Sequence, residues 1–87
     1  MENQTPPGGG VVIYSTPGCG RCQAAADFFQ ARGLAVTMVD VASDFAALRR
    51  MARLAPGTRT VPVIEYDGQA RVGFEPDYWN RRLGEQA

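Results

Sequence analysis

The apolar residues of the chain fall into short continuous runs separated by stripes at helical spacing. Residues 11–15 are β-branched or aromatic and nearly all apolar, which predicts a central strand buried on both faces. Residues 34–41 are again mostly apolar and predict a second strand. Between the two runs, residues 19–32 carry one apolar helical face, and Gly33 is a natural helix stop. The residues of that face are Cys22, Ala25, Ala26 and Phe29.

A second helical stripe follows the second strand. Ser43 is the predicted N-cap, and Pro56-Gly57 ends the helix. The apolar positions of the stripe are Phe45, Leu48, Met51, Ala52 and Ala55. Three arginines mark the opposite side, which is a solvated face or, alternatively, a docking surface for an acidic partner. These are Arg49, Arg50 and Arg53.

The last third of the chain predicts a hairpin and a final helix. Residues 63–66 and 69–72 are strands joined by an Asp67-Gly68 turn, and Pro76 suits the first position of a helix that Gly84 closes. The element order is therefore β-α-β-α-β-β-α, an α/β class. The first two strands must be parallel, with a right-handed helical crossover, and the last two form an antiparallel pair.

Length and composition limit the classes of protein to which this chain can belong. With 87 residues there is room for one domain, which we place at residues 11–84 after a Pro- and Gly-rich tail at residues 1–10 that we expect to be disordered. Nine basic residues, all arginine, balance nine acidic ones, which argues against nucleic acid or an anionic membrane as a partner. Residues 1–10 have no basic or apolar secretory region, so we expect a cytoplasmic protein, and a monomer.

The two cysteines carry the candidate chemistry. Cys19 and Cys22 lie three positions apart, where the first strand turns into the first helix. The positive end of the helix dipole, together with Arg21, would lower the pKa of Cys19 below the ordinary value of about 8.5 and make it the nucleophile. Cys22, one turn deeper on the apolar face, would resolve the mixed disulfide.

Other interpretations of this cysteine pair stay open. Zinc needs four ligands, and two thiols in a chain without histidine supply half of them. An iron–sulfur cluster shared across a dimer would draw on thiolates from two copies. A purely structural disulfide closing so short a loop would stabilise the fold little.

Val61-Pro62 is the second unusual feature, because proline is disfavoured at the entrance to an apolar strand. It is either an ordinary trans proline on an edge strand or a cis proline. In the cis form the backbone of Val61 would turn away from the sheet and could pair with an extended substrate peptide.

Taken together, these motifs resemble the glutaredoxin branch of the thioredoxin fold. The resemblance rests on residues 16–22 (TPGCGRC), on Thr60-Val61-Pro62 and on residues 73–77 (GFEPD). It implies a four-stranded mixed sheet with helices on both faces, and a cis Pro62 that packs beside Cys19. It also implies a substrate site around the dithiol, composed of Thr16, Gly18, Arg59, Thr60, Val61, Pro62, Gly73 and Phe74, with no metal.

Within that branch the chain is most similar to NrdH-redoxins, the glutaredoxin-like electron donors of ribonucleotide reductase. Residues 59–64 and 73–83 carry this likeness. It implies that no cofactor is bound, that thioredoxin reductase supplies electrons from NADPH, and that the acceptors are protein disulfides, ribonucleotide reductase among them.

Two further functions remain as alternatives. One is a glutaredoxin that uses glutathione or another low-molecular-weight thiol; the other is a non-catalytic iron–sulfur or metal carrier, or a redox-sensing module. Glutathione-using relatives typically have lysine where Thr16 stands, and Pro76 removes a backbone donor from the turn at Gly73. Arg59 argues the other way, because it could pair with a glycyl carboxylate.

Overall fold

The computed structural model describes residues 10–84, and the order of its elements is the predicted one. The strands are β1 (Val11–Ser15), β2 (Val36–Asp40), β3 (Val63–Tyr66) and β4 (Gln69–Val72). The helices are α1 (Gly20–Ala31), α2 (Phe45–Leu54) and α3 (Pro76–Gly84). The predicted tail, residues 1–10, lies outside the described residues except for Gly10.

The four strands form one mixed sheet in the order β2-β1-β3-β4. β1 runs parallel to β2 and antiparallel to β3, and β3 and β4 form the predicted hairpin. Asp67 and Gly68 both have positive φ, of 56° and 79°, as a two-residue hairpin turn requires. The predicted four-stranded α/β architecture is confirmed.

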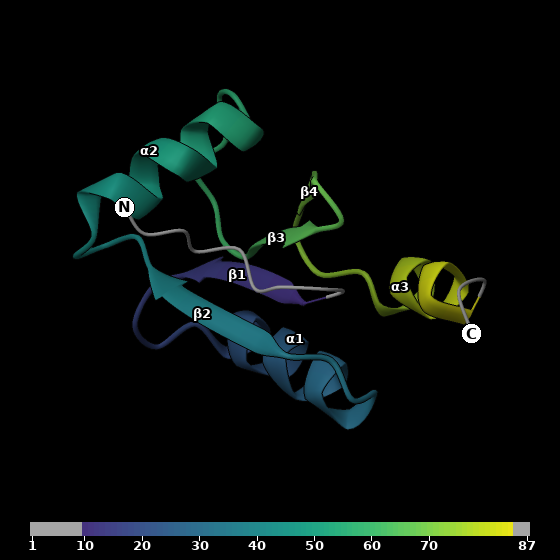
Figure 1. The fold of residues 1–87 in the computed structure, drawn as a ribbon. Coiled ribbons are helices and arrows are strands. Elements are labelled where there is room, and N and C mark those ends of the chain that lie inside the picture. The colour runs from purple at the N-terminus through teal and green to yellow at the C-terminus, as the bar shows by residue number, and fades with distance from the viewer. Residues whose placement is uncertain (1–9, 85–87) are drawn as a thin grey trace.

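Helices cover both faces of the sheet (Figure 1). Val11 and Ile13 point to the face of the sheet on which α1 and α3 pack. On that face the ring centroids of Trp79 and Phe29 lie 5.1 Å apart. Val12 and Tyr14 point to the other face, which α2 covers. β1 is therefore fully buried, as its apolar run predicted. No helix among residues 10–84 is long and apolar enough to cross a membrane.

Several predicted boundaries were wrong. The second strand is limited to β2 and is only partly buried, because it lies at the edge of the sheet. α1 is one residue shorter at each end than predicted, since Cys19 and Arg32 are its caps. The N-cap of α2 is Asp44, whose carboxylate accepts from the backbone N–H of Ala47 at 3.1 Å, whereas the hydroxyl of Ser43 donates to Asp40.

The apolar stripe predicted for α2 was wrong at Phe45 and at Ala52, both of which are exposed. Phe45 is 74% exposed, because it lies in the first turn and faces away from the sheet. Ala47 and Met51, one turn apart, are the buried positions of α2, and Leu48 and Leu54 pack partly against the same cluster.

The assignment of Arg50 to a solvated face was also wrong. Its guanidinium forms an ion pair with Glu65 of β3 at 2.8 Å and also donates to the hydroxyl of Tyr14 at 3.0 Å. Tyr14 in turn donates to Glu65 at 2.8 Å. Burial, together with the neighbouring Glu65 carboxylate, raises the pKa of Tyr14 well above its ordinary value. This network joins α2 to the two central strands.

Candidate active site

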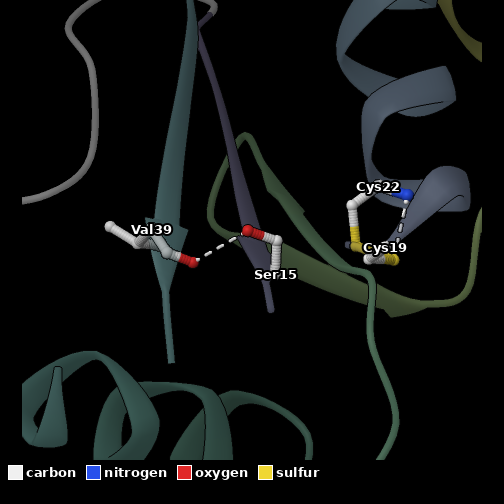
Figure 2. Close-up of a disulfide and its surroundings, with 4 residues drawn as sticks. All are labelled: Ser15, Cys19, Cys22 and Val39. Atoms are coloured by element: carbon white, nitrogen blue, oxygen red, sulfur yellow. Dashed lines mark hydrogen bonds between the residues drawn. A yellow bond between two sulfur atoms is a disulfide. The ribbon is translucent and has the colours of Figure 1, made fainter. Parts of the chain in front are cut away.

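The two cysteines lie at the junction between β1 and α1. Gly18 has a φ of 78° in the connecting turn, a conformation that L side chains rarely adopt. Cys19 is the N-cap of α1, and Cys22 follows one turn into the helix. They form a disulfide with a Cα–Cα distance of 5.3 Å (Figure 2).

The two sulfurs have different surroundings. Cys22 is 1% exposed and belongs to the core between the sheet, α1 and α3, whereas Cys19 is partly exposed. The backbone N–H of Cys22 donates to the sulfur of Cys19 at 3.2 Å. A partner molecule can therefore reach Cys19 from solvent, and an amide dipole at the helix N-terminus already points at its sulfur.

Ser15 fixes the end of β1 from which the cysteine loop leaves. Its hydroxyl donates to the carbonyl oxygen of Val39 in β2 at 3.3 Å (Figure 2). Its own carbonyl accepts from the backbone N–H of Val41 at 2.9 Å. The dithiol loop thus starts from the end of β1, where Ser15 is hydrogen-bonded to the neighbouring chain segment through both its side chain and its backbone.

The peptide bond between Val61 and Pro62 is cis, as the family resemblance implied. Pro62 is buried, and its carbonyl accepts from the N–H of Gly73 at 2.7 Å. Val61 packs against the same core cluster as Cys19 and Phe74. The cis-proline loop and the Gly73 turn are therefore tied to each other on the core that also holds the dithiol.

Arg21 provides a connection that the sequence did not predict. Its guanidinium donates to the carbonyl of Phe74 at 3.2 Å, across 53 residues of chain. The ring of Phe74 also packs edge-on against the ring of Phe28 in α1, with the two ring centroids 5.3 Å apart. The loop after β4 is thus held to α1 by its backbone and by its side chain, and no spacing in the sequence signals this pairing.

Two hollows border the loop that carries the dithiol, and Thr16 lines both. The first, of about 610 Å³, lies between α2 and the cis-proline loop; it includes Arg59, Thr60 and Val61 over an apolar floor that includes Leu48 and Met51. Four predicted substrate-binding residues therefore share this hollow. Pro62, Gly73 and Phe74 do not line it.

The second hollow, of about 450 Å³, lies on the β2 side and was not predicted. Gly18 and Cys19 line it together with Gln23, Met38 and Asp40. The mostly apolar run at residues 34–41 predicted a strand, but nothing in it indicated that two of its residues line the same hollow as Cys19.

Among residues 10–84, no group of three or more His, Cys, Asp or Glu side chains is arranged to hold a metal ion. Cys19 and Cys22 are the potential thiolate ligands of this part of the chain, and in this structure they are bonded to each other.

Comparisons with known proteins agree with the fold and the cysteine pair. The glutaredoxin family model matches residues 11–71. NrdH-redoxin from Escherichia coli is 30% identical, with a TM-score of 0.69 and coverage of 82% of this chain and 91% of that one. A search of curated proteins by sequence gave no match.

Two further solved structures share the fold. The methanoredoxin of Methanosarcina acetivorans is 22% identical, with a TM-score of 0.74 and coverage of 87% of this chain and 85% of that one. The thioredoxin-like protein BC3987 is 24% identical, with a TM-score of 0.71 and coverage of 82% and 96%. The chain belongs to the glutaredoxin family, and with its Cys19–Cys22 pair it is a thiol–disulfide oxidoreductase.

Proposed function

We propose that this glutaredoxin-family chain is an electron carrier of the NrdH-redoxin type. It works in the cytoplasm, takes electrons from NADPH through thioredoxin reductase, and passes them to protein disulfides. Ribonucleotide reductase is the acceptor that the family resemblance suggests. The electrons travel on the two thiols of the chain itself.

The difference in exposure between the two cysteines carries this proposal. The thiolate of Cys19 attacks one sulfur of the substrate disulfide; that S–S bond breaks, a Cys19–substrate disulfide forms, and the other substrate sulfur leaves and takes up a proton. Cys22 then loses its proton and attacks the sulfur of Cys19, which forms the intramolecular disulfide and releases the second substrate thiol. Two electrons pass from the dithiol to the substrate.

The buried position of Cys22 suits the second step. Cys22 lies within reach of the sulfur of Cys19, because the Cα atoms of the two cysteines are 5.3 Å apart. It is closed to substrates, because only 1% of the residue is exposed. The amide of Cys22 stabilises the Cys19 thiolate before attack and again when the reductase regenerates it.

The cis-proline loop supports recognition of an extended peptide. Thr60 and Val61 line the hollow beside the dithiol loop, and the pairing of β3 with β1 begins only at Val63. A substrate segment can pair with the backbone of Val61 while its cysteine approaches Cys19.

The choice of reductant rests on three replacements and on one similarity. Thr16 removes the lysine charge that glutathione-using relatives typically have. Phe74 replaces a small residue in the loop after β4, and Pro76, the first residue of α3, removes a backbone donor. The 30% identity to the Escherichia coli NrdH-redoxin, described as having a thioredoxin-like activity profile, points in the same direction.

A glutathione-dependent reductase is the second candidate, and one observation favours it. Arg59 is exposed, has no hydrogen bond or ion pair with any residue between 10 and 84, and lines the hollow next to Thr16. A guanidinium in that position suits the carboxylate of a small thiol peptide.

Reduction of insulin disulfides separates the two candidates. With NADPH and thioredoxin reductase, we expect catalytic turnover that Cys19→Ser abolishes. Turnover with glutathione, NADPH and glutathione reductase, but none with thioredoxin reductase, would reject the NrdH-type proposal and favour the second candidate.

A further inference from the structure

The hollow on the β2 side is lined by an acidic residue, an apolar residue and the reactive cysteine together. It lies between the start of α1 and the edge strand β2, and Cys19, Met38 and Asp40 all line it. A group that enters this hollow therefore shares it with Cys19, the residue that forms the mixed disulfide with a substrate.

The charge of Asp40 is held in position but not neutralised. One carboxylate oxygen accepts from the backbone N–H of Ala42 at 2.8 Å, and the other accepts from the hydroxyl of Ser43 at 3.0 Å. Both donors are neutral, and no cation of residues 10–84 forms an ion pair with Asp40. The turn thus fixes the carboxylate without cancelling its charge.

Met38 supplies the apolar part of the same hollow. It is 41% exposed on the edge strand, one of three large apolar side chains that are exposed in the described residues. An apolar surface ending in one fixed carboxylate matches a lysine or arginine, whose hydrocarbon stem packs on apolar surface while its cationic head stays in water.

We propose that this hollow is a specificity subsite for a basic residue next to the reactive cysteine of the substrate protein. The inference deepens the proposed function, because it rests on attack by Cys19. On the opposite flank, Arg59 gives the first hollow the opposite charge, and the two hollows meet at Thr16. A substrate segment that crosses Cys19 therefore meets a negative side and a positive side, which fixes its direction.

The test uses peptide disulfides with one variable position, directly before or directly after the cysteine, occupied by Lys, Gln or Glu. The pre-reduced protein is mixed with each peptide, and the release of peptide thiol is followed in a single turnover. Each rate is divided by the rate with dithiothreitol, because a neighbouring lysine also makes the peptide thiol a better leaving group. The readout is the Lys-to-Gln ratio of these normalised rates.

At one of the two positions we expect a Lys-to-Gln ratio of about two to five, the size of one exposed ion pair. Asp40→Asn, which keeps an acceptor for Ala42, should bring the ratio close to one. The matched control is Asp67→Asn, the same change in charge at the hairpin turn, where Asn tolerates a positive φ. This control should keep the ratio of the native chain.

Equal ratios for the native chain and Asp40→Asn at both positions would overturn the subsite. Salt gives a second measurement that needs no variant: between about 0.01 M and about 1 M salt the Debye length falls from about 30 Å to about 3 Å, so the ratio should fall towards one. A ratio that salt does not change contradicts the proposal. If the Gln peptides are reduced by dithiothreitol but not by the protein, the proposed function fails, and the subsite fails with it.

Discussion

Replacing Arg50 by methionine tests the network that joins α2 to the sheet. Methionine keeps an apolar stem but removes the charge and the donors, so Glu65, which is 4% exposed, is left with Tyr14 as its remaining partner in this network. Breaking a buried ion pair by removing one partner costs about 3–5 kcal/mol. Because the side chain of Arg50 is 33% exposed, water offsets part of this cost, and we expect a loss of about 2–3 kcal/mol.

A loss of that size is a large part of the stability of an 87-residue chain, which is roughly 4–13 kcal/mol from typical values per residue. Urea unfolding at neutral pH, followed by circular dichroism, measures it directly. The matched control is Arg49→Met, the exposed neighbour on the same helix, which we expect to change stability by no more than about 0.5 kcal/mol.

The reasoning also predicts the double variant Arg50→Met/Glu65→Gln. Since it leaves no unpaired charge, it should recover at least about 1 kcal/mol relative to Arg50→Met alone. If Arg50→Met and Arg49→Met unfold at the same urea concentration, the network does not contribute to stability and the argument is refuted.

Three further predictions concern the site and the core. Cys22→Ser should accumulate a mixed disulfide on Cys19 when mixed with a protein disulfide, visible by mass spectrometry on intact protein; full catalytic reduction by this variant would contradict the resolving role. Arg21→Met should speed hydrogen exchange in the loop at Phe74 about fivefold, the effect of one lost hydrogen bond of about 1 kcal/mol; Arg21→Lys should restore part of the protection, and unchanged exchange would reject the tether. Above about pH 10 an unfolded tyrosine loses its proton, whereas Tyr14 in the folded protein keeps its proton because its pKa is raised. The free energy of unfolding should therefore fall as pH rises above this value. A fall of the same size in the Tyr14→Phe variant would assign the effect to other groups.

The helical and strand segments were predictable because their signals are local. The run at β1, the stripe of α1 and the Asp67-Gly68 turn each depend on residues adjacent in sequence or one turn apart, and each was confirmed. The stripe of α2 shows the limit of this approach. Its first apolar residue, Phe45, has the right spacing, but whether the first turn of a helix faces the sheet depends on how the preceding loop enters.

The site was predictable where one motif carries it. Two cysteines at a strand-to-helix turn predicted the disulfide pair and the deeper position of Cys22. The cis bond before Pro62 was one of two open interpretations from local statistics, and the family resemblance chose between them.

The sequence alone determined the dithiol, the element order and the class of chemistry, since each follows from short-range spacing and from chain connectivity. Tertiary structure alone decided which charges meet. Arg50 pairs with Glu65, Arg21 reaches Phe74, and Asp40 borders the hollow of Cys19 without an ion pair to any cation of residues 10–84. Such pairings depend on the register of the strands and on the rotation of each helix. A shift of one residue in strand register moves a side chain to the opposite face of the sheet, and the same shift in a helix rotates it by about 100° around the axis. Spacing along the chain therefore does not specify these pairings.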